Sequence, residues 1–384
     1  MSNHLFLTIV PILLPAIVKD LSLNYSAVGL ILGLSTLVFG LFQLLSGFLA
    51  MAYRRKVILG LGNLLISFGT FASGLASGFY DFLAYRFMVS VGQSPQHPAG
   101  TSLILDKVSS RSRGSAIGLH FSMEHIGSIL GPVVSFILLA FTDWRGVFIF
   151  ISLIPLLLAS SILLIIKEER LKEHSSAVGF RDLISVLRML RFKPFLLLLS
   201  TQLVVSVGTT HSVLVNLIPL YLNRDLGISP GSISFFLLAL FLGGASGSMM
   251  SGRLSDIAGR YKTASAFILI SSFILYILHL SASFGLFGSL TALFLLGFTS
   301  FSISPILQAY LVDIVKPELR DVALTFYYTI TMASTSIWLI VVGFILDATN
   351  SFPSVFAFMA TIALSGVAAI TFLAASYKIY VRSW

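Results

Sequence analysis

Long apolar runs, separated by short polar breaks, take up almost the whole of this chain. Hydrophobic residues make up 57% of it and charged residues only 10%, whereas about 25% charged is usual in soluble domains. A helix of about 20 apolar residues crosses the roughly 30 Å hydrocarbon core of a bilayer. The pattern excludes a soluble globular fold and predicts an all-α membrane protein with twelve transmembrane helices. We expect them at 3–18, 26–52, 57–77, 80–105, 114–141, 146–166, 194–222, 231–252, 262–281, 285–312, 321–346 and 353–377.

The first run begins almost at Met1, where a signal peptide would also begin. It lacks a basic segment before it, and His4, Pro11 and Pro15 interrupt its apolar character. We therefore expect a retained helix, whose full start could lie upstream of Met1.

The positive charges favour one side of the predicted helix array. Twenty Lys and Arg lie in alternate loops that would share one side, and only Lys19, Arg145 and Arg224 lie in the others. Positive residues concentrate on the cytoplasmic side of membranes. We therefore expect a multi-pass protein of the plasma (inner) membrane with both termini cytoplasmic. The net charge of +9 then reflects topology and contact with the lipid bilayer, and no nucleic-acid partner is expected.

The two halves of the chain repeat one another. Residues 47–56 align with 252–262 at an offset of 205, and 97–108 align with 304–315. Such duplication is typical of transporters built from two similar bundles. We predict two pseudo-symmetric six-helix bundles, at 1–167 and 194–384, joined by a cytoplasmic linker at 168–193. Three further pairs lie 207 residues apart: Pro98 with Pro305, Asp106 with Asp313, and Arg113 with Arg320.

Ionisable residues inside the apolar runs gather between Arg86 and Pro132. His97 and Glu124 fall at nearly the same depth if the fourth run goes inward and the fifth goes outward. His120 and Glu124 share one face of the fifth run. Intramembrane ionisable groups are costly and usually functional. We predict that Glu124 binds the coupling proton with His97 and His120 as neighbours; the alternative is a permanent Glu–His pair that holds two helices together. His125 points away from this face and is expected to serve packing or hydrogen bonding.

Other polar side chains inside the runs are candidates for contact with a solute. Arg86 and Gln93 share a face of the fourth run with His97. Arg86 could tune the proton site or bind an anionic substrate, or it could only pair at a helix end. The second half offers neutral groups that suit an organic solute or, alternatively, contacts between helices. These are Gln202, Ser206, Gln308 and Tyr328.

Several other kinds of chemistry lack their sequence signals. There are no cysteines, which excludes disulfides and thiolate metal sites, and no P-loop that would bind ATP. His120 and Glu124 could ligate a metal together with His97, so a membrane-embedded metalloenzyme is the alternative outside the transporter class. No HExxH pattern accompanies them. A receptor or scaffold that does not transport would need a partner-binding loop or domain, and the loops are too short for one. We expect no cofactor, no metal and no enzyme activity, and we expect a monomer.

The stretch GRLSDIAGRYK at 252–262 resembles the loop motif of the major facilitator superfamily. The resemblance implies a gating role for Gly252, Asp256, Gly259 and Arg260. In the first-half copy, Met51 replaces the usual Asp and Arg54 replaces the usual Gly. A gate there would rest on Arg54 and Arg55 with another acceptor, for which Asp106 and Asp313 are candidates; alternatively these basic residues only set the topology.

The stretch GSILGP at 127–132 resembles a signature of proton-coupled antiporters in that superfamily. It implies that Gly127, Gly131 and Pro132 allow close helix packing and a bend. Gln93, His97 and Pro98 are similar to the fosmidomycin-resistance-type exporters of the same superfamily.

The resemblance and the residues together predict a secondary active transporter that works by alternating access. We expect a proton-coupled exporter (antiporter) of a small organic compound or drug, with H⁺ and that small molecule as its partners. The alternative within this fold is proton-coupled uptake of a small anionic metabolite.

Overall fold

The computed structural model describes residues 2–97, 99–100, 103–104, 113–166, 193–209, 211–315 and 320–382. All regular structure in these residues is helical, which confirms the all-α prediction. The chain divides into two compact units: residues 1–177 with 228–234, and residues 178–227 with 235–384. The predicted linker at 168–193 lies almost wholly outside the described residues, so the predicted domain boundaries stay a prediction.

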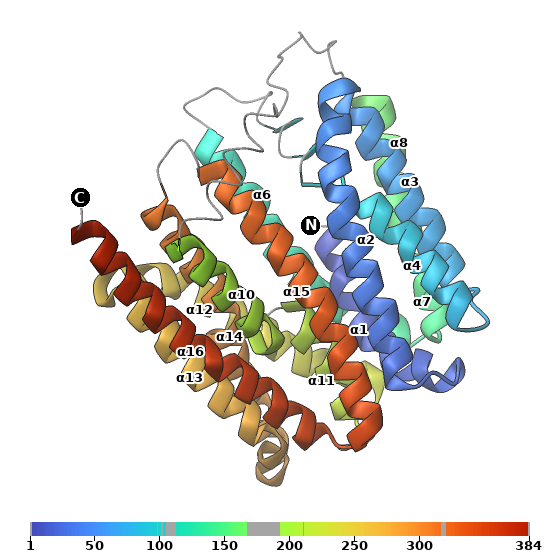
Figure 1. The fold of residues 1–384 in the computed structure, drawn as a ribbon. Helices are drawn as coiled ribbons and strands as arrows, with labels where there is room; N and C mark the ends of the chain where they lie inside the picture. Colours follow the sequence, from blue (N-terminus) through green and yellow to red (C-terminus); the bar gives the residue numbers. More distant parts are fainter. Residues whose placement is uncertain are drawn as a thin grey trace. The chain divides into compact units, whose positions relative to one another are not determined.

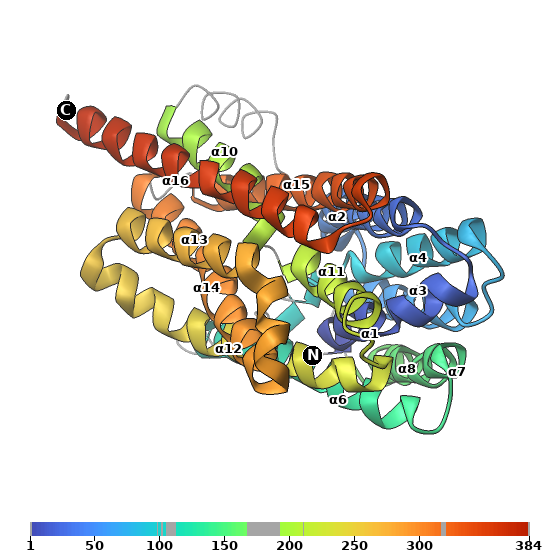
Figure 2. The same ribbon diagram turned by 90° about the horizontal axis from the view of Figure 1, so that it is seen from below.

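The first unit contains two groups of packed helices. α3 packs against α4, α7 and α8, and α1 packs against α6 (Figures 1 and 2). Gly62 and Gly92 let α3 and α4 approach closely, because a Cβ on Gly92 would lie 2.5 Å from the carbonyl oxygen of Gly62. The helices of this unit are α1 (Ser2–Asp20), α2 (Tyr25–Ala52), α3 (Arg55–Ser73), α4 (Phe79–Gln93), α6 (Arg113–Leu139), α7 (Trp144–Ile151) and α8 (Leu153–Ile165).

The second unit is arranged around α10 and α16, which pack against each other (Figure 1). α13 also packs on α16, and α15 packs on α10. Their shared core includes Phe195, Ile268, Leu307 and Tyr327, each no more than 1% exposed. The helices are α10 (Lys193–Thr209), α11 (His211–Arg224), α12 (Pro230–Ala258), α13 (Arg260–Ile277), η2 (Leu278–Phe284), α14 (Gly285–Ile314), α15 (Arg320–Thr349) and α16 (Phe352–Arg382).

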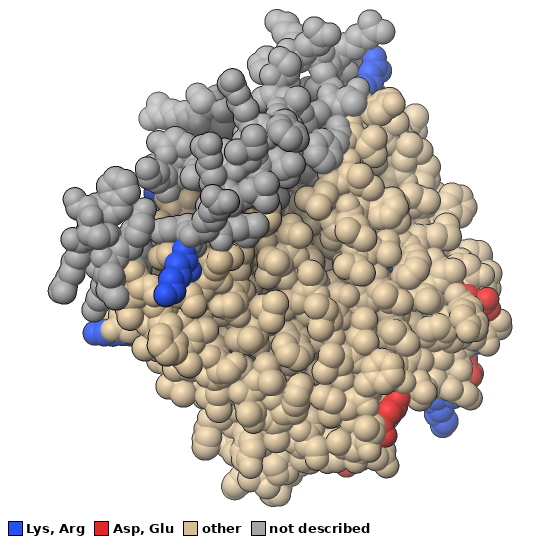
Figure 3. Space-filling model, in the orientation of Figure 1, with Lys and Arg blue, Asp and Glu red and all other residues tan. Residues whose placement is uncertain are grey.

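Every predicted run except the one at 80–105 coincides with one helix or with two consecutive helices. Among the described residues, eight helical stretches are long and apolar enough to cross a membrane. Many large apolar side chains on them are exposed, such as Leu164 at 83% and Phe273 at 63%, as expected for a surface solvated by lipid. On the face drawn in Figure 3, charged side chains are few and lie toward the margins.

Two predicted runs differ from the structure by a break inside the helix. The run at 80–105 was expected to be continuous, but α4 ends at Gln93 and a turn follows at 94–97. The run at 146–166 is divided at Ser152 into α7 and α8. Proline causes such breaks because it lacks a backbone N–H and clashes with the preceding turn. Pro95 lies within the turn at 94–97, and Pro155 lies in the first turn of α8, three residues after Ser152.

One end of the first unit is held together by Arg145. Its guanidinium donates to Asp20 Oδ2 at 2.8 Å, at the end of α1, and to the carbonyl oxygens of Gly74 and Ala76 at 3.2 and 2.7 Å, after α3. The guanidinium also lies 4.4 Å from the centre of the Trp144 ring, whose Nε1 donates to Asp20 as well. Three helices are thereby joined at one point, which we call the Arg145 junction.

Candidate functional site

The structure places the Glu124 carboxylate between two imidazole rings. His4 Nε2 lies 3.3 Å from Glu124 Oε2, and His97 Nδ1 lies 3.5 Å from Glu124 Oε1. The two rings have centroids 6.4 Å apart and are nearly perpendicular. The Glu124 side chain is only 12% exposed, and those of His4 and His97 are 25% and 34% exposed. We call these three residues the His–Glu cluster.

The close packing of α1 on α6 positions the His4 side of the cluster. Thr8 is fully buried, and a Cβ on Gly131 would overlap its Oγ1. His4 lies one turn before Thr8, and Glu124 lies about two turns before Gly131. A glycine at position 131 therefore brings α1 near enough for His4 to reach the carboxylate. Gly127, another predicted packing residue, is also buried on α6.

His97 reaches the cluster from the turn that follows α4. Ser46 of α2 and Ser94 in this turn share a buried hydrogen bond of 2.8 Å between their hydroxyl groups. Ala99 N donates to the Pro95 carbonyl oxygen at 3.0 Å, so helical hydrogen bonding resumes past the break. His97 and Glu124, which were predicted at nearly the same depth, thus lie 3.5 Å apart, although the helix that carries His97 is interrupted.

Ser128 links His4 to the backbone of α6. Its Oγ lies 3.4 Å from His4 Nδ1 and 3.2 Å from the Glu124 carbonyl oxygen. Neither His4 nor Ser128 was predicted as a site residue. The available signal was His4 itself, a histidine inside the first apolar run. It counted above only as evidence against a signal peptide. The predicted neighbour His120, and His125, lie on α6, but their side chains are outside the described part of the structure.

The nitrogen and oxygen atoms of the His–Glu cluster also lie close enough together to be candidate ligands of a metal ion. One ligand atom from each of His4, His97 and Glu124 lies within 4.8 Å of the others. Zinc and related ions commonly bind such nitrogen and oxygen donors. The hydrogen bond between His4 and Ser128 and the close imidazole–carboxylate contacts already account for the arrangement of the three side chains.

Arg86 and Gln93, both predicted to contact a solute, are buried in α4. Their side chains are 7% and 3% exposed. Arg86 Nε and Gln93 Nε2 are inaccessible to water and have no hydrogen-bond partner among the described residues. Such unsatisfied donors are rare in folded proteins.

The polar residues predicted in the second unit form a network of neutral hydrogen bonds. Tyr327 OH donates to Gln202 Oε1 at 2.7 Å and lies 3.1 Å from Ser304 Oγ. Gln308 Nε2 donates to Ser304 Oγ at 3.1 Å, and Tyr328 OH donates to Gln308 Oε1 at 3.0 Å. The hydroxyl groups of Ser206 and Ser334 also bond to each other. Gln202 and Ser206 are fully enclosed, while Tyr328 is 44% exposed.

The loop motif of the second unit is built around Arg260. Its guanidinium lies 2.5 Å from Asp256 Oδ1 and donates from Nε to Asp313 Oδ2 at 2.9 Å, at the far end of α14. The hydrogen bond to Asp313 raises the pKa of Arg260 further above its usual range. Gly259 precedes α13 with φ of +94°, a conformation that favours glycine. Gly252 has open space beside it.

The first-half copy of this loop has no comparable carboxylate among the described residues. Arg54 is exposed at the start of α3, and Arg55 is half-buried. Asp313, one candidate acceptor for them, bonds to Arg260 within the second unit. Asp106, the other candidate, lies outside the described residues.

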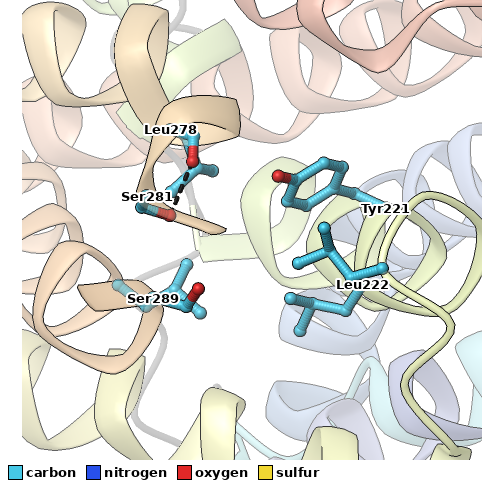
Figure 4. Close-up of a pocket in the computed structure, with 7 residues that line it drawn as sticks. Tyr221, Leu222, Leu278, Ser281 and Ser289 are labelled. Carbon is cyan, nitrogen blue, oxygen red and sulfur yellow. Dashed lines mark hydrogen bonds between the residues drawn. The ribbon is translucent and has the colours of Figure 1, made fainter. Parts of the chain in front are cut away.

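A small depression lies in the second unit between α11, η2 and α14 (Figure 4). It is too narrow to enclose a solute, and Leu222, Leu278 and Leu293 line it with Tyr221, Ser281 and Ser289. The Ser281 hydroxyl donates to the Leu278 carbonyl oxygen at 2.6 Å, so its polar group is already used. The lining offers no charge to orient a solute.

Comparison with known proteins places this geometry in a family. The model of the Major Facilitator Superfamily matches residues 1–213 and 203–379. The chain is 26% identical over 298 residues to the uncharacterized MFS-type transporter YcaD of Escherichia fergusonii, a match that spans 75% of this chain and 72% of that protein. It is 28% identical over 141 residues to the probable L-galactonate transporter of Escherichia coli K12, which is 37% of this chain and 31% of that protein.

Solved structures share the fold at low sequence identity. A bacterial homologue of the human lysosomal transporter Spinster, in an inward-facing and unoccupied conformation, superposes with a TM-score of 0.78 at 17% identity, covering 99% of this chain and 94% of that one. The nucleoside transporter NupG superposes with a TM-score of 0.83 at 11% identity, covering 97% and 96%. The predicted fold class is therefore confirmed. The chain belongs to the Major Facilitator Superfamily and is a multi-pass membrane transporter.

Proposed function

We propose that this transporter couples the movement of a small organic compound to protons and that Glu124 carries the coupling proton. The observation that supports this most directly is the Glu124 carboxylate held between the imidazoles of His4 and His97. Carboxylates and imidazoles inside membrane proteins recur in proton relays. Export of the compound in exchange for protons is the direction we propose, as in the drug:proton antiporters and fosmidomycin-resistance-type exporters that the sequence resembles.

Ser128 allows His4 to hold either one proton or two. A hydroxyl has one proton to donate. When Ser128 donates to the Glu124 carbonyl, His4 Nδ1 must donate to Ser128, and a second proton on Nε2 then faces the carboxylate. When the hydroxyl turns toward Nδ1, a neutral His4 can still donate from Nε2 to Glu124. His4 can thus gain or lose a proton while each of its nitrogens keeps a partner, and the Ser128 bond to the Glu124 carbonyl is given up when the hydroxyl turns toward Nδ1.

The rest of the transport cycle follows from the same proposal. The protein would act as a monomer in the plasma (inner) membrane with both termini cytoplasmic. Solute contacts would come from Arg86 and Gln93 of the first unit and from Gln202, Ser206, Gln308 and Tyr328 of the second. Gating would involve Arg260 with Asp256, flanked by Gly252 and Gly259, and the basic pair Arg54 and Arg55. Alternating exposure would arise from movement of two six-helix bundles at 1–167 and 194–384.

The second candidate function is proton-coupled uptake of a small anionic metabolite. Buried Arg86, which has no counter-ion among the described residues, favours an anionic solute. The name of the probable L-galactonate transporter, one of the relatives, is that of a sugar-acid carrier. Both candidates share the proton site and differ in direction and substrate.

A proteoliposome assay with an internal pH dye would test the proton role. Wild type and Glu124→Gln are compared while anionic, cationic and neutral solutes are added, L-galactonate among them. We expect solute-dependent proton movement in wild type and its loss in Glu124→Gln, because the amide cannot release a proton. A chelator added to wild type serves as a control for a bound metal.

Three outcomes would contradict the proposal. Proton movement that survives in Glu124→Gln would place the proton elsewhere. Solute flux without proton movement in wild type would make the protein a uniporter, with Glu124 joining helices only. Activity that the chelator abolishes and added Zn²⁺ restores would point to a metal in place of a proton. The direction of the flux under an imposed pH gradient separates export from uptake.

A further inference from the structure

We infer that Arg86 and Gln93 form a subsite for the carboxylate end of a hydroxylated organic acid. The inference rests on the proposed function, because the acid would be the transported solute. It goes further in assigning a chemical class to that solute and an order to its contacts along α4.

Arg86 has no counter-ion among the described residues. A guanidinium removed from water needs a compensating negative charge, because the loss of hydration of a buried ion is costly unless an opposite charge replaces it. The Arg86 side chain is 93% buried, since its exposed fraction is 7%. No hydrogen bond or ion pair joins it to any described residue, and its Nε is left unsatisfied.

The carboxylates in the described part of the first unit are all engaged with groups other than Arg86. Asp20 accepts from Arg145 at 2.8 Å, and Asp81 accepts from the Ser77 backbone N–H at 3.2 Å. Asp143 accepts from Gly146 N at 2.9 Å, as the cap of α7. Glu124 lies against His4 and His97. None of these groups pairs with Arg86, so a negatively charged group of a ligand could serve as its counter-ion.

Two buried donors, on Arg86 and Gln93, lie along one face of α4. Gln93 follows Arg86 by seven residues, which is two turns or about 10 Å along the same face. Its amide Nε2 is also a buried donor without a partner among the described residues. A planar guanidinium binds a carboxylate through two parallel hydrogen bonds. A longer acid with hydroxyl groups could then offer an acceptor to Gln93 as well, which a short acid could not reach.

Binding measured by thermal unfolding of the purified full-length protein tests the subsite. Each acid is paired with an alcohol that lacks its charge: gluconate with sorbitol, lactate with propane-1,2-diol, and benzoate with benzyl alcohol. We expect gluconate to raise the unfolding temperature at concentrations where sorbitol has no effect. Arg86→Gln should weaken gluconate about 10- to 100-fold, the range for loss of a charge-assisted hydrogen bond.

Two more variants separate a binding role from a structural one. Arg86→Lys keeps the charge and loses the planar fork, so it should bind gluconate more weakly than wild type and more tightly than Arg86→Gln. Gln93→Leu should weaken gluconate and leave lactate unchanged. Lys19→Gln, which removes an exposed positive charge at the end of α1, serves as the control and should change nothing.

The inference is overturned if no acid of the panel stabilises wild type, or if each alcohol stabilises as well as its acid. It is also overturned if gluconate binds Arg86→Lys and Arg86→Gln as tightly as wild type. Its failure is distinct from failure of the proton role. Carboxylate binding that depends on Arg86, found without proton movement in liposomes, would keep the subsite and remove the coupling. Proton-coupled flux that does not depend on the charge of the solute would keep the coupling and remove the subsite.

Discussion

The same positions in the two sequence repeats carry different chemistry. The offset of 207 pairs His97 with Ser304 and Glu124 with Thr331. In the first unit, His97 and Glu124 lie 3.5 Å apart as titratable groups. In the second unit, Ser304 belongs to a neutral network with Tyr327 and Gln202, and Thr331 donates to the carbonyl oxygen of its own helix.

The helix packing beside these positions differs in the same way. Gly131 allows α1 to approach α6 closely, whereas Trp338, which the offset pairs with it, fills the corresponding place on α15. The indole Nε1 of Trp338 donates to the Leu203 carbonyl oxygen at 2.7 Å. Duplicated bundles can therefore diverge so that one keeps titratable groups in close contact and the other keeps a neutral, well-bonded interior. Four changes would break or sharpen this comparison.

The largest effect is expected from Gly131→Ala. The added Cβ would overlap Thr8 Oγ1 and press α1 away from α6, which would cost about 1–3 kcal/mol of unfolding free energy and separate His4 from Glu124. Thermal unfolding in detergent should show the loss. Gly47→Ala is the matched control, because nothing lies within 4 Å of its new methyl group and no loss is expected. Equal stability of the two variants would show that the close approach is unimportant.

The next effect concerns the proposed proton site. His4→Gln should lower proton-coupled transport about tenfold and change its pH profile, because Glu124 keeps only one of the two described imidazole partners. Thr331→Val in the second unit should leave both rate and profile unchanged. A pH profile measured in proteoliposomes for the two variants decides the matter. An unchanged profile in His4→Gln would mean that the histidine only packs.

A third change tests the neutral network. Tyr327→Phe removes the hydroxyl that donates to Gln202 and leaves a buried amide oxygen without that donor. Such a loss costs about 1–3 kcal/mol of unfolding free energy. We expect reduced thermal stability with proton movement retained. Loss of proton movement in a stable Tyr327→Phe protein would instead place part of the proton path in the second unit.

The smallest effect is expected at the loop motif. Arg260→Ala removes ion pairs whose partners Asp256 and Asp313 are 61% and 49% exposed, so the stability change should stay within about 1 kcal/mol. Because the pKa of Arg260 is raised, its charge and any stabilisation that depends on it persist at pH below that value and disappear only in strongly alkaline solution. Unfolding of wild type and Arg260→Ala across about pH 6–9 should therefore show a constant difference. Added salt should reduce the difference, and a difference unaffected by salt would exclude an ion-pair origin.

Much of the fold could be predicted because apolar run length alone determines a membrane helix. Depth counting also placed His97 and Glu124 at nearly the same level, and the two side chains lie 3.5 Å apart although His97 stands in a turn. His4 could not be predicted, because a single histidine in an apolar run gives no partner, and its contact with Glu124 spans 120 residues of sequence. The break after Gln93 depends on how a proline is accommodated, which run length does not record.

The Arg145 junction has a mechanical consequence for any transport cycle. It joins the ends of α1 and α3 to the start of α7 through side-chain and carbonyl contacts. A movement of α1 that begins at His4 is therefore passed on to α3 and α7 at the opposite end of α1, where Arg145 joins them. If the His–Glu cluster binds a proton as proposed, a shift of α1 would be shared with α3 and α7, because the Arg145 junction holds the ends of these helices together.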